Sequence, residues 1–192
     1  MKNVLLYLSA FIPMYLLIII KQCMEMIMGN IKLNFLNFFV LGLLVVIILL
    51  GLLGLKLEIF NRKGEEREVV VVEKTNTTDE HFLGYFSLFV LFAITFDLSK
   101  VSMLIVFILI LIMIGVVYVK NKLFYINPFL NILGFNFYDI TYKEKGSKKE
   151  CSIKIFFKGD LVLENKYRLK VKDENFSFLS KEKSNKTGGN LK

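Results

Sequence analysis

The sequence predicts a membrane protein with four transmembrane helices, arranged as two helical hairpins, and a small cytoplasmic antiparallel β domain. Three observations lead to this fold class. Of the 192 residues, 55% are hydrophobic, and these gather in long runs instead of mixing with the 22% that are charged. Four of the runs lie before residue 120. After residue 135 the chain changes to an alternation of apolar and polar residues, which is typical of strands.

The four apolar runs are the predicted transmembrane helices of a domain that covers residues 1–122. About 20 helical residues cross the hydrocarbon core of a bilayer. The second and fourth runs reach this length alone, whereas the first and third need interfacial residues to complete them. No small-residue cleavage pattern follows the first run, so we expect it to be retained as a span. The predicted spans are residues 4–20, 35–55, 78–96 and 101–119.

A short polar stretch, TFDLSK at residues 95–100, separates the third and fourth runs. It is too short for a domain, so we interpret it as the tight turn of a helical hairpin. Asp97 or Ser99 would cap the fourth helix, and Lys100 would reach the lipid headgroups. The alternative is a buried Asp97 in a proton or ion path. Asp97 is therefore a candidate interfacial or sensing residue.

Basic residues near the span ends predict which side of the membrane is cytoplasmic. With four spans, both termini and the loop 56–80 share one side, and positively charged loops favour the cytoplasm. We therefore expect both termini to be cytoplasmic. On this arrangement Cys23 and Cys151 lie on opposite sides and cannot form a disulfide. The predicted inner side carries Lys2, Lys56, Arg62, Lys63, Arg67, Lys74, Lys120 and Lys122, and the outer side carries Lys21, Lys32 and Lys100.

The cytoplasmic loop 56–80 contains a predicted strand and a predicted helix start. The β-branched segment 68–73, EVVVVE, favours a strand. The sequence TTDE at residues 77–80 matches a capping box for the third helix. His81, the one histidine of the chain, then falls in the first turn of that helix. It is either a pH-sensing residue or an interfacial polar residue.

Residues 123–134 predict a short helix at the membrane interface. Asn127 and Pro128 form a favourable helix start, and Gly134 a favourable end. Phe124, Tyr125 and Phe129 predict an aromatic belt at headgroup level.

The cytoplasmic β domain is predicted for residues 135–180, followed by a disordered tail at residues 181–192. So small a domain buries little apolar surface by itself. We expect additional packing from the 68–73 strand, from other copies of the chain in a homo-oligomer, or from a partner. The predicted strands are residues 136–144, 151–158, 160–164 and 166–172, with a fifth at 175–180.

The alternation within these strands predicts one core face and one basic face. Ile153, Ile155 and Phe157 share a face, as do Tyr167, Leu169 and Val171. The opposite face is either solvated, or a docking surface for an acidic protein, or a contact with anionic lipid or nucleic acid. Direct nucleic-acid binding is not expected. The candidate partner-docking residues are Lys154, Phe156, Lys158, Arg168, Lys170 and Lys172; Phe156 is expected to be exposed among these cations.

Sequence motifs for catalysis, cofactors or metals are absent from the chain. There is one histidine, no glycine-rich phosphate loop and no nucleophile elbow. We therefore expect no enzyme activity, no cofactor and no metal. Polar residues within the apolar runs are sparse, which argues against a transporter with a hydrated site.

Three stretches of the chain resemble a known family. They are MKNVLLYLSAFIPMY at the N-terminus, HFLGYFSLFVLFAITFDLSKVSMLIVFILI from residue 81, and LFYINPFLNILGFNFY from residue 123. Together they are similar to the KwaA family, the four-span membrane subunits of the Kiwa anti-phage defence system. The resemblance implies a multi-pass protein of the bacterial inner membrane that works with a cytoplasmic, DNA-binding effector, KwaB.

The favoured functional hypothesis is a non-enzymatic membrane sensor and scaffold. It would detect infection at the inner membrane and anchor or activate the effector. The rival hypothesis is a pore-forming effector that depolarises the cell. A third is a membrane anchor for an unrelated complex.

Overall fold

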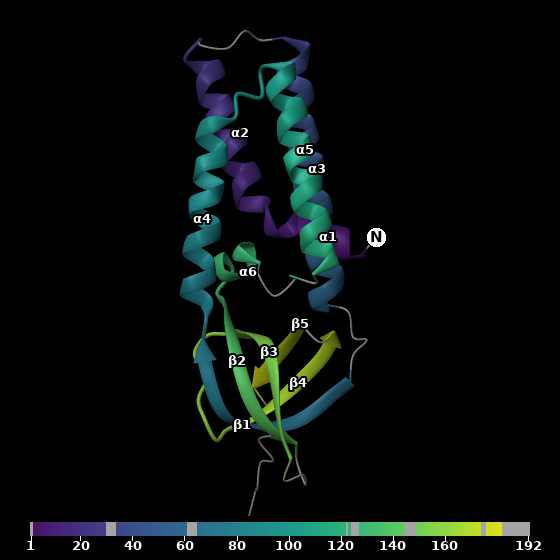
Figure 1. Cartoon of the computed structure of the whole chain (residues 1–192), viewed down its shortest axis with the longest axis vertical. Helices are drawn as coiled ribbons and strands as arrows, with labels where there is room; N and C mark the ends of the chain where they lie inside the picture. The colour runs from purple at the N-terminus through teal and green to yellow at the C-terminus, as the bar shows by residue number, and fades with distance from the viewer. Residues whose placement is uncertain are drawn as a thin grey trace, which may run out of the picture.

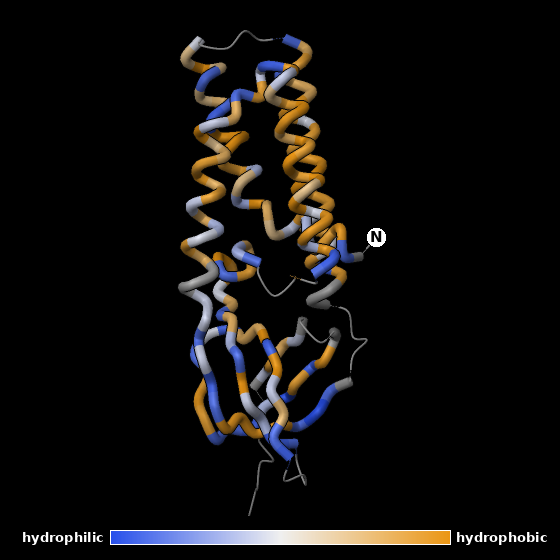
Figure 2. The backbone as a smooth tube through the Cα atoms, viewed as in Figure 1, coloured by the Kyte–Doolittle hydropathy of each residue, from blue (hydrophilic) through white to orange (hydrophobic). Residues whose placement is uncertain are grey.

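A computed structural model describes residues 2–29, 34–60, 65–121, 123, 127–144, 149–173 and 176–181. A bundle of helices lies at one end of the molecule and a β barrel at the other (Figure 1). Figure 2 shows the same division in hydropathy, because apolar residues cover the long helices whereas polar and apolar residues alternate along the strands. The helices are α1 (Lys2–Ala10), α2 (Ile12–Ile27), α3 (Phe35–Phe60), α4 (Thr78–Thr95), α5 (Val101–Lys120) and α6 (Pro128–Ile132). The strands are β1 (Glu65–Asn76), β2 (Phe135–Glu144), β3 (Glu150–Lys158), β4 (Lys166–Asp173) and β5 (Phe176–Lys181).

The prediction of four transmembrane helices is wrong. Within the described ranges, two segments are long and apolar enough to cross a membrane, residues 35–57 of α3 and all of α5. The apolar part of α4, Phe82–Thr95, would rise roughly 21 Å against a hydrocarbon core of about 30 Å. The first predicted span is broken into α1 and α2, which meet at an angle of 50° and could count only together as one span.

The break between α1 and α2 has a cause in the sequence. Pro13 stands in the first turn of α2. A proline inside a continuous helix has no N–H for the carbonyl group four residues earlier, here that of Ser9, and its ring clashes with that group. The chain therefore leaves helical geometry at Phe11, with φ −96° and ψ 3°. A run of apolar residues alone does not reveal this bend.

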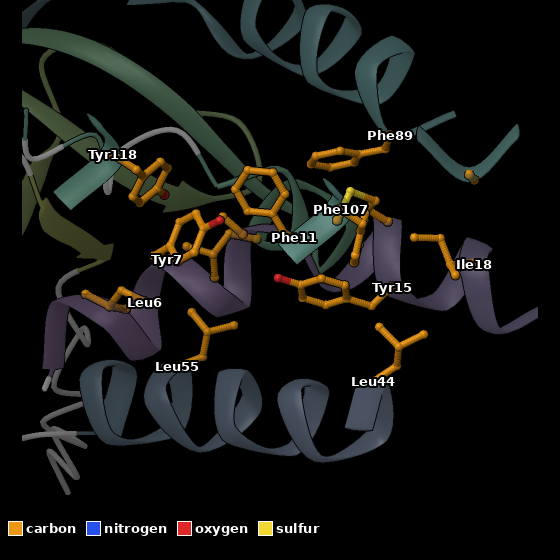
Figure 3. Close-up of a cluster of buried hydrophobic side chains, with 14 of the residues drawn as sticks. Leu6, Tyr7, Phe11, Tyr15, Ile18, Leu44, Leu55, Phe89, Phe107 and Tyr118 are labelled. Atoms are coloured by element: carbon orange, nitrogen blue, oxygen red, sulfur yellow. The ribbon is translucent and has the colours of Figure 1, made fainter. Parts of the chain in front are cut away.

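Aromatic side chains from α1, α2, α4 and α5 fill the centre of the helical bundle (Figure 3). The ring of Tyr7 lies 5.0 Å from that of Phe11 and 5.5 Å from that of Tyr118 in α5. Phe11 in turn lies 5.4 Å from Phe89 in α4. The bend at Phe11 thus places a buried aromatic side chain between α1 and α4.

The strands form a closed barrel in the order β1-β2-β3-β5-β4. The long β1 closes it, because Glu65–Val70 pair with β4 and Val69–Asn76 pair with β2. A bulge between Val71 and Glu73 bends β1 between these two partners. The neighbours β3 and β5 are parallel. This is the strand order of the OB-fold, a five-stranded Greek-key barrel.

The predicted antiparallel sheet is therefore corrected in two respects: the sheet is closed, and one of its pairs is parallel. The sheet has no unpaired edge, because β5 runs beside β3 and the bent β1 pairs with strands on both of its sides. The expectation that the 68–73 strand completes the β domain is confirmed, with longer bounds. The strand predicted at residues 160–164 is wrong, because these residues form an irregular connection whose Glu164 has φ 62°.

Side chains fill the inside of the barrel. Both predicted core faces point inward, because Ile155, Phe157, Tyr167 and Leu169 are all buried in one cluster. Leu161, from the connection after β3, is also buried there. The barrel interior is thus a packed core.

Candidate functional site at the junction of helices and barrel

The start of α4 is hydrogen-bonded to the start of β2. The backbone N–H of Phe137 donates to the Thr78 hydroxyl oxygen at 2.8 Å, and that hydroxyl donates to the Phe137 carbonyl oxygen at 3.3 Å. The backbone N–H of Thr77 also donates to this carbonyl oxygen, at 3.2 Å. Both Thr78 and Phe137 are buried. The junction of β1 and α4 is therefore fixed to β2 by three bonds.

A group of phenylalanine rings on the outside of the barrel joins the core of the helices. The ring of Phe156 lies 5.5 Å from that of Phe137 and 5.7 Å from that of Phe178. Phe137 and Phe156 belong to the same buried cluster as Leu130 of α6 and Phe89 of α4. Their strands carry other side chains into the barrel core, so β2 and β3 pack apolar residues on both faces at this level.

The helix α6 links β2 to α1. The predicted start of this helix is confirmed, because the Asn127 side-chain oxygen accepts from the backbone N–H groups of Phe129 and Leu130 at 3.1 and 3.3 Å. The amide nitrogen of Asn127 donates to the Ser9 hydroxyl oxygen at 2.9 Å, and Ser9 donates to the Leu6 carbonyl oxygen at 2.6 Å. Asn127 and Ser9 are both buried. The predicted aromatic belt residues Phe124 and Tyr125 lie outside the described residues.

The six predicted docking residues do not form one surface. Phe156 is only 1% exposed, so its predicted exposure is wrong; the face that carries it turns toward the helices instead of solvent. Lys158, Arg168 and Lys170 do come together, around a pocket of about 440 Å³. Lys154 lies apart, in a depression that Glu73 and Asp139 also line. The side chain of Lys172 lies outside the described residues.

Asp97 belongs to the turn between α4 and α5. Its side-chain oxygen accepts from the Ser99 backbone N–H at 3.2 Å and from the Ser99 hydroxyl, and Lys100 lies 3.3 Å away. The Ser99 hydroxyl, followed by Lys100, holds the pKa of the Asp97 carboxyl group below its ordinary value. The predicted tight turn is confirmed, but neither Asp97 nor Ser99 caps α5, whose N-cap residue is Lys100.

His81 falls within α4, but its side chain lies outside the described residues. The predicted capping box at residues 77–80 is corrected, because Thr77 makes no side-chain capping bond. Its neighbour Thr78 bonds β2 instead. In the described part of the chain, no group of three or more His, Cys, Asp and Glu residues could hold a metal ion.

A family model described as anti-phage protein KwaA matches residues 2–179. The match spans the helices, the junction and the barrel together. The chain belongs to the KwaA family of anti-phage proteins. The predicted family is thereby confirmed, and a role in anti-phage defence follows from it. No curated protein and no solved structure matches the chain.

The junction residues of this KwaA-family protein were missed by the sequence analysis. Thr78 and Phe137 are 59 residues apart, and Asn127 and Ser9 are 118 residues apart. No local pattern signals bonds across such distances. The capping-box prediction used Thr77 and left the neighbouring Thr78 without a partner, although it is Thr78 that bonds β2.

Proposed function

We propose that this KwaA-family protein is a non-enzymatic sensor and scaffold of the bacterial inner membrane. It detects infection through its helices and anchors or activates a cytoplasmic, DNA-binding effector protein of the KwaB type through its barrel. The family establishes the defence role; the sensing role, the partner and the location are our proposal.

One observation carries the proposal: the helices α4, α5 and α6 are inserted between two adjacent strands of the barrel. The chain leaves β1 at Asn76 and returns into β2 at Phe135. The Thr78 hydroxyl ties this exit to this return, since it bonds Phe137. A change in the packing of α4 therefore acts directly on the β1–β2 pair and does not pass through a flexible linker.

The surface of the helices supports a membrane location. Large apolar side chains are exposed along both long helices, as in Leu49 (54%) and Leu53 (53%) of α3 and Ile112 (57%) and Met113 (69%) of α5. Lipid chains would cover such surfaces at no hydrophobic cost. The helix α1 lies in the half of the bundle nearer the barrel (Figure 1). The basic loops of that end favour the cytoplasm for the N-terminus and the barrel.

The barrel surface supports a protein partner over a nucleic acid. Exposed aromatic side chains on the outer sheet face are the usual stacking platforms of OB-fold proteins that bind single strands. Here Phe137 and Phe156 are 2% and 1% exposed, because the helices cover them. These two rings are thus unavailable to bases.

Phage plating efficiency tests the proposal. Bacteria would carry this gene alone, its neighbouring gene alone, or both. We expect protection only with both genes, and loss of protection with Thr78→Val despite normal membrane levels of the protein. Thr141→Val is the matched control and should protect normally, because Thr141 is half-buried on the same strand as Phe137 and the contacts of its hydroxyl are exposed.

The same experiment separates the rival function. Protection, or cell death with influx of a membrane-impermeant dye, from this chain alone would identify a pore-forming effector. Full protection by Thr78→Val would show that the junction does not transmit the signal.

A further inference from the structure

The pocket that gathers Lys158, Arg168 and Lys170 lies on the outer surface of β3, β5 and β4. Lys158 and Arg168 are exposed, and Lys170 is half-buried. A single carboxylate, that of Glu66, lies among the lining residues. Within the described residues the pocket therefore has three cations against one anion, and it favours an anionic ligand.

Strand pairing explains why these cations meet. Lys170 is opposite Phe178 of β5 and Glu66 of β1. Arg168 is opposite Ser180 of β5 and Glu68 of β1. Directly opposite residues on one face of a sheet lie about 5 Å apart at their Cβ atoms. The two cations of β4 thus project from the same face, two residues apart, beside Phe178 and Ser180 of β5.

One side of the pocket is aromatic and continues into the helical core. Phe135 and Phe178 line the pocket, and both also pack against the buried cluster of the helices. Their rings are 6.0 Å apart, and the Lys158 ammonium group lies 5.9 Å from the centre of the Phe135 ring. An anion in this pocket would contact ammonium and guanidinium groups on one side and apolar rings on the other.

The pocket adjoins the helical end of the barrel, because Phe135, the first residue of β2, and Phe178 line it and also pack against the buried cluster of the helices. Figure 1 shows β2 beginning directly below α6, at the end of the barrel nearest the helices. With α3 and α5 in a bilayer, this side of the barrel lies against the headgroups of the same leaflet. A lipid phosphate would meet the cations there, while glycerol and acyl carbons would meet the rings of Phe135 and Phe178.

We propose that this pocket binds the phosphate group of an anionic phospholipid in the leaflet that faces the barrel. The inference rests on the proposed membrane location, but it does not require the proposed sensing role. Lipid binding here would hold the barrel against the bilayer and fix its orientation relative to the helices.

Lipid binding to the full chain in detergent tests this proposal. The purified protein would be titrated with short-chain phosphatidylglycerol, with phosphatidylcholine of the same chain length, and with glycerol phosphate, and bound ligand would be counted by native mass spectrometry. We expect one phosphatidylglycerol to bind in preference to phosphatidylcholine. The double variant R168Q/K170Q should weaken this binding roughly 30-fold, since each basic residue at a membrane surface contributes about fivefold.

The matched control is K143Q/K154Q, which removes two cations from β2 and β3 outside the pocket. It should bind phosphatidylglycerol as the unmodified chain does. Equal binding by both double variants would overturn the proposed site, and equal binding of glycerol phosphate and phosphatidylglycerol would overturn the lipid as its ligand. Neither readout depends on phage protection, so failure here leaves the proposed function to its own test.

Discussion

The backbone N–H of Phe137 donates to the Thr78 hydroxyl oxygen at 2.8 Å and so joins the first turn of α4 to β2. Both residues are buried, at 8% and 2% exposure. A buried donor without a partner costs about 1–3 kcal/mol. Thr78→Val keeps the shape of the side chain but removes this acceptor. We expect it to lower the free energy of unfolding by that amount.

Thermal unfolding of the purified protein in detergent measures this effect. The control, Thr141→Val, alters a hydroxyl whose contacts with Glu73 and Ser152 are exposed and 3.5 Å long. It should change the free energy of unfolding by no more than about 0.5 kcal/mol. Equal stability of the two variants would contradict a structural role for the Thr78 bond.

Two glycines of α3 predict opposite effects of the same substitution. A Cβ atom at Gly54 would lie 2.5 Å from the Leu5 Cβ and 2.9 Å from the Leu5 carbonyl carbon. Gly54→Ala must therefore push α1 away from α3, at a cost of about 1–3 kcal/mol. A Cβ atom at Gly42 meets nothing within 4 Å. Gly42→Ala should be neutral or stabilise α3 by up to about 1 kcal/mol.

The unfolding temperatures of these two variants in one detergent provide the measurement. Because both are Gly→Ala changes in the same helix, the difference between them isolates the contact with α1. A Gly54→Ala protein as stable as the Gly42→Ala protein would mean that α1 does not pack closely on α3.

The long helices could be predicted from sequence, because hydropathy and length decide them. The spans predicted at residues 35–55 and 101–119 correspond to the helices Phe35–Phe60 and Val101–Lys120. The number of transmembrane spans could not be predicted, because a single proline, Pro13, breaks the first apolar run into two helices despite its high hydropathy. The helix α4 is too short to count as a span, because its first turn is polar and only the remainder is apolar.

Strand periodicity predicted which residues of the barrel face inward, but not what covers the outward face. Period-two alternation places Ile155 and Phe157 on one face and Phe156 on the other. Whether that other face is exposed to solvent depends on contacts with α6 and α4, which are distant in sequence. The same limit applies to barrel closure, which needs the pairing of β1 with both β2 and β4.

Phe156 provides a direct test of its corrected position. A buried phenylalanine that packs between Phe137 and Phe178 should leave a cavity when truncated. Phe156→Ala is therefore expected to cost about 3–5 kcal/mol in the free energy of unfolding. Val162→Ala, at a side chain that is 53% exposed, should cost less than about 0.5 kcal/mol. Chemical denaturation in detergent would measure both changes. An unchanged stability of Phe156→Ala would indicate that Phe156 is exposed, as the sequence predicted.

The lowered pKa of Asp97 predicts a pH-dependent contribution to stability. Because the folded-state pKa lies below that of an unfolded aspartate, about 3.9, ionised Asp97 stabilises the fold above that pH. The stabilisation is lost as pH falls through the folded-state value. The difference in unfolding temperature between the unmodified protein and Asp97→Asn should therefore shrink below about pH 4.

Ser99→Ala tests the cause of that shift. The Ser99 hydroxyl is the largest contributor to the lowered pKa of Asp97. Its removal should raise the pKa of Asp97, which a carbon-detected NMR titration of labelled aspartate in the full chain would measure. An unchanged pKa would assign the shift to Lys100 instead, 3.3 Å from the carboxylate.

Lys21 of α2 caps the C-terminal end of α4 from a neighbouring helix. Its ammonium group donates to the carbonyl oxygens of Ile94 and Phe96, each at 3.1 Å. The last carbonyl groups of a helix have no partner within the helix and carry partial negative charge, so a cation stabilises them by about 0.3–1 kcal/mol. Lys21→Met keeps most of the side chain but removes the donor, and should lower the free energy of unfolding by about that amount. Lys21→Arg keeps a charged donor and should retain most of this stabilisation. Unfolding in detergent at low salt measures both variants. Equal losses of stability in the two variants would assign the effect to packing instead of charge.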